Sequence, residues 1–312
     1  MSAAGQKTAI DWLAFRTQAE PVAALEAMRG LYRYAGPELR LVPLDHAKDG
    51  FRQACALQIE DMPLGRVDFG GPSQRGWVRW NLTGQGCAWV QDWDALEAVE
   101  CLPSSQIRRL DIALTTWHGE VDHEMVVAAH GVGLFTCGGC PPHLRQITSS
   151  NVRAGRTCYV GTREKSDKFF RAYEKGFELV GKMGPVGESV TEIDGHDLAG
   201  IYRCEVELKA VNRDIPWEVV ERRDQYFAGA YPFLAQLLPG VESDILLRRP
   251  ERQAQTDLRV ALANCRAQYG ATLFTALTAY HGDIGRVWEQ IIGAQHNPSL
   301  LASGVLLVDH DA

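Results

Sequence analysis

The chain has 312 residues, of which 46% are hydrophobic and 23% are charged. This composition excludes a largely disordered chain and is sufficient for one large domain, or for one domain with an extension. The formal net charge of −7 argues against uniform coating of nucleic acid, although a local basic strip is compatible with it. Residues 1–10 lack a secretory pattern, and no run of about 18 apolar residues occurs, so we expect a cytoplasmic protein that does not enter a membrane.

In the first hundred residues, a strand and a helix precede a region rich in strands that ends in a short helix. Glycine-rich breakers separate the apolar runs, and this pattern predicts a meander of antiparallel strands. We expect strands at residues 9–16, 54–58, 65–69 and 76–82, and helices at residues 22–34 and 92–99.

The middle of the chain is also rich in predicted strands. A strand and a helix are expected at residues 108–116 and 122–130, followed by a hairpin with a charged tip and, after a long polar loop, a further strand. The hairpin strands are residues 157–161 and 169–175, the loop is residues 184–195, and the last strand is residues 202–210.

The remaining residues have helical periodicity. Helices are predicted at residues 217–238, 255–268 and 271–293, separated by proline and glycine. We therefore predict two domains, residues 1–215 and a helical C-terminal region of residues 216–312.

The segment from Arg203 to Lys209 is the most informative, because its odd positions are all charged and its even positions are all apolar. A strand points successive side chains to opposite faces, so Arg203, Glu205, Glu207 and Lys209 would share one face. An ordinary solvated sheet face is the simpler explanation for one such strand. A site is favoured because two further strands share the pattern.

Those two strands carry Asp111 beside Arg109, and Tyr173 between Arg171 and Lys175. If the three strands are neighbours in one sheet, their polar faces merge into a patch of hard oxygen ligands, cations and a tyrosine. The flanking cations of Tyr173 would help to stabilise a phenolate and to hold a phosphate. This inventory suits phosphodiester chemistry.

Any catalytic cation would be held mainly by carboxylates, because no His-x-His pair occurs in the sequence. Carboxylate ligands favour Mg²⁺ or Mn²⁺ over zinc. Phosphate-cradling glycine motifs, dinucleotide fingerprints and the serine hydrolase elbow are likewise absent from the sequence.

Three ordered motifs resemble the replication initiation factor family, the Rep-trans rolling-circle initiators of certain plasmids and filamentous phages. They are Arg109-x-Asp111, the run from Tyr159 to Arg171-Ala-Tyr173-Glu174-Lys175, and Arg203-x-Glu205-x-Glu207-Leu-Lys209. The resemblance covers residues 9–212 and leaves out the helical tail. It implies an α+β fold of the relaxase or nickase type, with a largely antiparallel sheet, flanking helices and a C-terminal helical region.

The resemblance implies a metal-dependent enzyme that nicks and rejoins origin DNA through a tyrosine linked to the 5′-phosphate. Tyr173 would be the nucleophile, with Lys175 and Arg171 stabilising the phosphate. Asp111, Glu205 and Glu207 would be the acids associated with Mg²⁺ or Mn²⁺. The expected DNA-binding residues are Arg109, Arg163, Lys165, Lys168, Arg203 and Lys209.

One position departs from the family pattern, because Thr115 stands where relatives often carry a second acid. The expected partners are double- and single-stranded origin DNA, with a host helicase, a host polymerase and a second copy of the chain as further candidates. Two other functions stay open, namely a conjugative relaxase or mobilisation protein of the same chemistry and a catalytically inactive DNA-binding regulator. The helical tail could dimerise, read DNA or contact a helicase.

Overall fold

The computed structural model describes residues 6–33, 39–136, 140–164, 166–211, 213–246 and 250–307. The chain forms two compact units, Met1–Leu246 and Leu247–Ala312.

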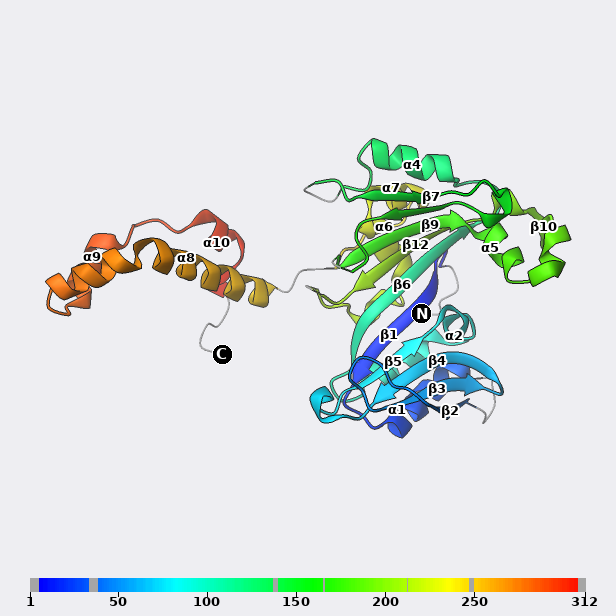
Figure 1. The fold of residues 1–312 in the computed structure, drawn as a ribbon, viewed down its shortest axis with the longest axis horizontal. Helices are drawn as coiled ribbons and strands as arrows, with labels where there is room; N and C mark the ends of the chain where they lie inside the picture. Colours follow the sequence, from blue (N-terminus) through cyan, green and yellow to red (C-terminus); the bar gives the residue numbers. More distant parts are fainter. Residues whose placement is uncertain are drawn as a thin grey trace. The chain divides into compact units, whose positions relative to one another are not determined.

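A ten-stranded antiparallel sheet is the centre of the first unit, in the order β2-β3-β4-β5-β1-β6-β12-β9-β8-β7 (Figure 1). The sheet confirms the predicted α+β class with a largely antiparallel sheet. Its strands are β1 (Ala9–Thr17), β2 (Leu39–Leu44), β3 (Gln53–Ile59), β4 (Met62–Phe69), β5 (Val78–Leu82), β6 (Gln106–Thr116), β7 (Leu144–Ile147), β8 (Thr157–Val160), β9 (Lys168–Glu174) and β12 (Tyr202–Lys209).

Two strands of this sheet were not predicted, and both lie at its edges. β2 contains Pro43, which lacks a backbone N–H and is tolerated in edge strands. β7 has only four residues, and most of them are exposed. Edge strands bury little apolar surface, so they leave a weak periodic signal in the sequence.

Short helices cover the sheet, and the last two of the first unit pack against its apolar face. They are α1 (Pro21–Met28), α2 (Gly84–Ala88), α3 (Glu97–Glu100), α4 (His123–Gly131), α5 (Lys175–Gly181), α6 (Arg223–Ala230) and α7 (Pro232–Leu237). A two-stranded ribbon of β10 (Glu192–Ile193) and β11 (His196–Asp197) lies at the end of the predicted polar loop and just beyond it.

The core beneath the central strands is formed by side chains at register positions of one face. Val206 of β12 lies opposite Ile112 of β6 and Phe170 of β9, and all three side chains are fully buried. Phe135 packs on Phe170 with ring centroids 4.9 Å apart. Because this face is apolar, the other face of the same strands must carry the charged residues.

The division of the chain at residues 246/247 lies beyond the boundary that the sequence placed near residue 215. The helices α6 and α7 contribute Phe227 and Leu234, both fully buried, to the core of the first unit. A change from strand to helix periodicity therefore did not mark the end of a packing unit.

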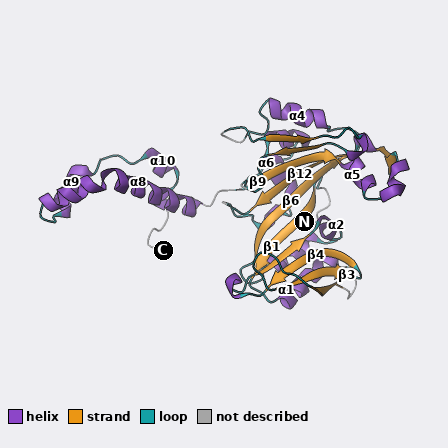
Figure 2. Cartoon of the chain, in the orientation of Figure 1, coloured by secondary structure: helices purple, strands orange, loops and turns teal. Residues whose placement is uncertain are grey.

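The second unit is helical, as predicted, and consists of α8 (Pro250–Ala279), α9 (Ile284–Ile291), α10 (Pro298–Ala302) and a short turn of 3₁₀ helix (Figure 2). The predicted break near residue 270 is absent, because one interior glycine costs a helix only about 1 kcal/mol. The helix ends instead at Ala279, and in the turn that follows, Gly282, which has a φ of 85°, donates its N–H to the carbonyl of Leu277. None of the described helices is long and apolar enough to cross a membrane.

We predict that a fragment of residues 1–246 unfolds cooperatively at a temperature close to that of the full chain, because its core is complete. A fragment ending at residue 215 should not fold. It loses several buried apolar side chains, each worth about 1.5–3 kcal/mol, from a domain stabilised by roughly 5–15 kcal/mol. Thermal unfolding followed by circular dichroism checks both fragments, and a cooperative transition in the shorter one would contradict the placement of α6 and α7.

Candidate active site

The polar faces of β6, β12 and β9 merge, because β12 lies between the other two strands. Glu207 is paired with Asp111 on one side of β12, and Glu205 is paired with Arg171 on the other. Arg203 lies opposite Tyr173. The structure thus meets the condition on which the sequence argument depended.

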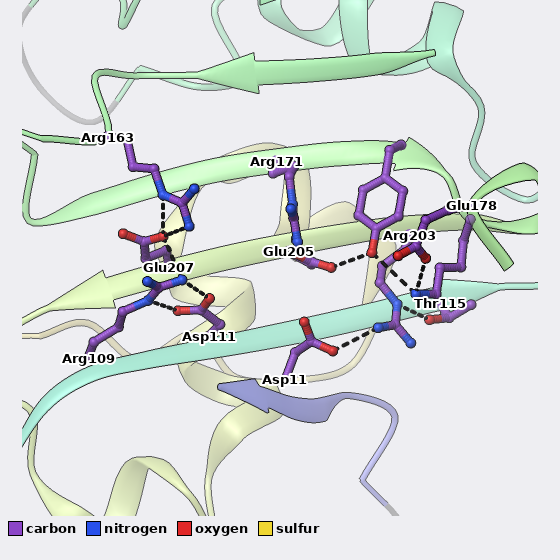
Figure 3. Close-up of polar contacts among 12 residues, drawn as sticks. Asp11, Arg109, Asp111, Thr115, Arg163, Arg171, Glu178, Arg203, Glu205 and Glu207 are labelled. Atoms are coloured by element: carbon purple, nitrogen blue, oxygen red, sulfur yellow. Dashed lines mark hydrogen bonds and ion pairs between the residues drawn. The ribbon is translucent and has the colours of Figure 1, made fainter. Parts of the chain in front are cut away.

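A groove of about 1020 Å³ runs over this polar face. Its lining includes Trp12 of β1 and Gln85 of α2 as well as Arg171, Tyr173, Lys175 and Arg203. Its volume is at the upper end of the range of ligand pockets. Figure 3 shows how the charged side chains from four strands gather there.

Tyr173 is almost buried, with 9% of its surface exposed. Its hydroxyl donates to Oε1 of Glu205 at 2.7 Å. Burial raises the pKa of Tyr173 well above its usual value, the charge of Glu205 raises it further, and Arg203 and Arg171 offset only part of the increase. The flanking cations therefore do not produce a phenolate in this state, contrary to the sequence-based expectation.

Lys175 is the second group within reach of the tyrosine, with Nζ 3.5 Å from the Tyr173 hydroxyl. It is the first residue of α5, where the chain leaves β9. The next residue, Gly176, lies against the backbone of Leu198, and a Cβ there would meet the Leu198 carbonyl oxygen at 2.2 Å. This close approach fixes the start of α5. Burial lowers the pKa of Lys175, and Glu178, its ion-pair partner, opposes that effect.

Glu205 uses both of its carboxylate oxygens within the site. Oε2 accepts from Nε of Arg171 at 2.8 Å, while Oε1 accepts from Tyr173. The Arg171 guanidinium also lies 4.9 Å from the centroid of the Tyr173 ring. Arg171, Tyr173 and Glu205 therefore form one hydrogen-bonded cluster.

Asp111 and Glu207 form a second cluster with Arg109 and Arg163. Arg109 donates to Asp111 Oδ1 at 2.8 Å and lies 2.9 Å from Glu207 Oε2, which also accepts from Arg163. Lys209 lies 3.4 Å from the other oxygen of Glu207. Burial raises the pKa of Asp111 to about 6, Arg109 lowers it in part, and the charges of Glu207 and Glu205 raise it.

The three acids expected to bind metal line one small cavity of about 10 Å³, together with Arg163, Phe169 and Arg171. That is roughly the room needed by one water molecule. Among the described residues, however, no three His, Cys, Asp or Glu side chains are arranged to hold a metal ion. Two carboxylates still suit Mg²⁺, which proteins commonly bind through one or two carboxylates and substrate phosphates.

Asp11 is a site residue that the sequence argument missed. Arg203 donates from Nη1 to Asp11 at 2.9 Å and from Nε to Thr115 at 2.8 Å. A register shift between Ile10 and Trp12 makes Asp11 the extra residue of a β-bulge, and bulges re-aim side chains. A carboxylate thus lies beside Thr115, where relatives often carry an acid. The sequence did contain a signal for this residue, because Asp11 is an isolated acid in an otherwise apolar strand.

The other predicted DNA-binding residues separate into two groups. Arg163 and Lys209 lie at the polar face with Glu207. Lys168 shares the opposite face of β9 with Phe170, where its ammonium donates to the carbonyl of Ala230 at 2.5 Å. Lys165 lies outside the described residues.

The comparisons with known proteins agree with the motifs. Residues 105–257 match the family model for replication initiation factors. A rolling circle replication initiator protein from Geobacillus stearothermophilus has a similar fold, with a TM-score of 0.50, 23% sequence identity, and coverage of 72% of this chain and 83% of that chain. No curated protein matches the chain. The resemblance inferred from the motifs is confirmed, and the family match begins at β6.

The raised pKa of Asp111 predicts a pH-dependent contribution to stability. A carboxyl whose pKa is higher in the folded state stabilises fully below its unfolded value of 3.8, and this contribution is lost as the pH rises through about 6. Relative to an Asp111→Asn variant, the wild-type protein should lose on the order of 3 kcal/mol of unfolding free energy between about pH 4 and 7. Urea unfolding at several pH values measures this difference.

Asp61→Asn provides the matched control, because the Asp61 side chain is fully exposed. Its unfolding free energy should follow that of the wild-type protein at every pH. A constant difference between the wild-type protein and Asp111→Asn would contradict the proposed environment of Asp111.

Proposed function

We propose that this chain, whose residues 105–257 match the family model for replication initiation factors, is a rolling-circle initiator that nicks and rejoins origin DNA with Tyr173 as its nucleophile. The observation that carries the proposal is the position of the Tyr173 hydroxyl in a groove, hydrogen-bonded to a carboxylate and 3.5 Å from an ammonium. Covalent catalysis requires a nucleophile whose hydroxyl lies within hydrogen-bonding reach of groups that can activate it, here a carboxylate and an ammonium.

The proposed reaction exchanges one phosphodiester for another. Tyr173 Oη attacks the phosphorus of the scissile phosphate, a new bond forms between Oη and phosphorus, and the bond to the 3′ oxygen breaks. The protein retains the 5′-phosphate, and the released 3′-hydroxyl is a primer for a host polymerase. Rejoining reverses the exchange, so no external energy source is needed.

Cations around the tyrosine would stabilise the charge that develops on the phosphate. Lys175, Arg171 and Arg203 all line the groove, and each is at present paired with an acid. Arg171 and Arg203 are held by Glu205 and Asp11, so the guanidinium groups are oriented before DNA binds. Preorganised donors of this kind cost little reorganisation during the reaction.

Asp111 and Glu207 are the residues that would hold the divalent cation, Mg²⁺ or Mn²⁺. Their donor chemistry fits, because both are carboxylates at facing positions of β6 and β12. Burial raises the pKa of Asp111, and the charges of Glu207 and Glu205 add to this increase. When bound, such an ion supplies Lewis-acid polarisation of a phosphate oxygen. Arg109 and Arg163 occupy these carboxylates in this structure and would have to release them.

Origin DNA is the proposed partner, in double-stranded form for recognition and in single-stranded form in the groove. Base-independent contacts would come from Arg109, Arg163, Arg203 and Lys209. Lys168 is not part of this proposal, because its ammonium faces the other side of the sheet. The cytoplasm is the proposed compartment.

We predict that Tyr173→Phe abolishes the covalent adduct with a supercoiled plasmid that carries the origin, while origin binding is retained. Phenylalanine preserves the ring and removes only the attacking oxygen. Denaturing electrophoresis of labelled DNA detects the adduct, and a gel-shift assay measures binding. An adduct that persists in the variant would remove Tyr173 from the role.

Tyr159→Phe is the control for this experiment. Tyr159 shares the polar face, opposite Arg171, and stacks on Phe169 with ring centroids 5.6 Å apart. The Tyr159→Phe protein should form the adduct at the wild-type level.

A separate prediction concerns the cation. Glu207→Gln should weaken Mn²⁺ binding in the presence of a noncleavable origin oligonucleotide by about tenfold or more, since removal even of supporting groups costs that much. Titration calorimetry measures the affinity, with the exposed-site variant Asp61→Asn as the control. Equal affinity in the Glu207→Gln and wild-type proteins would exclude Glu207 as a ligand.

A further inference from the structure

Glu205 differs from the other two acids in what it contacts. The residue is 3% exposed, and one carboxylate oxygen accepts from Tyr173 at 2.7 Å while the other accepts from Arg171 at 2.8 Å. Asp111 and Glu207 instead contact Arg109, which bridges them. Two neighbouring clusters on β12 therefore hold acids in different chemical settings.

We propose that Glu205 is the proton acceptor for Tyr173 and is not a metal ligand, and that Arg171 is a positioning residue that fixes the carboxylate. The inference rests on the proposed nicking function. As Oη bonds to phosphorus, its proton moves to Oε1 of Glu205, and the leaving 3′ oxygen takes a proton from water in the groove. During rejoining, the 3′-hydroxyl attacks phosphorus and loses a proton to water, while Glu205 returns its proton to Oη.

The geometry selects Glu205 over the other groups near the hydroxyl. A general base must lie within about 2.6–3.2 Å of the proton donor, and Glu205 meets this requirement. Lys175 lies 3.5 Å away, but its ammonium is a donor already paired with Glu178. Asp111 and Glu207 are held by arginines on the neighbouring part of the sheet.

Transfer of the proton also removes a repulsion. A charged Glu205 would lie beside the phosphate that becomes attached to Tyr173, and like charges at this distance in a buried site are costly. Once protonated, Glu205 is neutral and can donate a hydrogen bond. The Tyr173 hydroxyl donates to Glu205 before the reaction, so its proton must pass to an acceptor as Oη bonds to phosphorus.

Arg171 explains how Glu205 stays oriented toward the tyrosine. Cross-strand pairing places the two residues directly opposite each other, and the guanidinium donates through both Nε and Nη2 to one carboxylate oxygen. This leaves Oε1 for Tyr173. A planar guanidinium with a fixed fork geometry suits this task better than a lysine does.

The test is single-turnover adduct formation on a single-stranded origin oligonucleotide by the full-length Glu205→Gln protein. Glutamine keeps the shape and removes the proton acceptor, so we expect a loss of about 10²–10⁴-fold near neutral pH. The rate should then rise about tenfold per pH unit, because the reaction depends on the phenolate fraction. Wild-type activity in the variant would overturn the proposal.

Other charged groups line the groove around Tyr173 and contribute to the pH profile. They are Arg171 on β9, Arg203 on β12, Lys175 and Glu178 on α5, Asp11 on β1 and Asp111 on β6. An Asp11→Asn variant serves as the control for general electrostatic effects, and its profile should keep the wild-type slope. The tenfold slope in Asp11→Asn as well would contradict a specific role of Glu205.

A metal-binding role is tested separately. Mn²⁺ affinity with a noncleavable oligonucleotide should be unchanged in Glu205→Gln, and a loss equal to that of Glu207→Gln would overturn the proposal. A second variant, Glu205→Ala, opens space for a small carboxylate, and added acetate should restore part of its activity. Absence of rescue in a folded Glu205→Ala protein would count against the proposal.

Failure of the proposed function can be told apart from failure of this inference. If the wild-type protein forms no adduct, the nicking function fails. The effect of Glu205 on ionisation of Tyr173 can still be measured from the phenolate absorbance, taken as the difference from the Tyr173→Phe protein. This absorbance should appear at a lower pH in Glu205→Gln than in the wild-type protein. An unchanged titration would contradict the contact itself.

Discussion

The register of β12 between β6 and β9 is the constraint on which the rest of the site depends. Cys204, Val206 and Leu208 are buried in the core, so the alternate residues must all lie on the opposite, polar face of the sheet. A slip of one residue would turn the charges into the core and the apolar residues into the groove, which is prohibitively costly. Burial of the apolar residues of β12 therefore fixes the face on which its charged residues lie.

Once four charged residues share a largely buried face, they need partners from the neighbouring strands. Buried charges are stable only when they are paired and hydrogen-bonded. β9 supplies Arg171 to Glu205, and β6 supplies Arg109 near Glu207. Because the partners come from opposite sides, one strand carries two different environments. In our account, Glu205 accepts the proton of Tyr173, whereas the environment of Glu207 binds the cation and the phosphate.

The two-residue period was enough to predict the central strands and the face on which Asp111, Tyr173 and Glu205 lie. It could not show that β12 lies between β6 and β9, because strand order depends on packing of the whole chain. Asp11 was missed because a bulge breaks the period on which the argument relied. Lys168 was assigned to DNA through its place in a motif, although its parity with Phe170 puts it on the other face. The edge strands and the packing of α6 were missed because neither leaves a distinctive local pattern.

The most direct test of the account is to identify the residue that becomes linked to DNA. The protein would be incubated with origin DNA and a divalent cation, digested with protease and nuclease, and the nucleotide-bearing peptide sequenced by mass spectrometry. The account predicts that the nucleotide is attached to Tyr173 through its 5′-phosphate. Attachment to another residue, or to the 3′ end of the DNA, would contradict it.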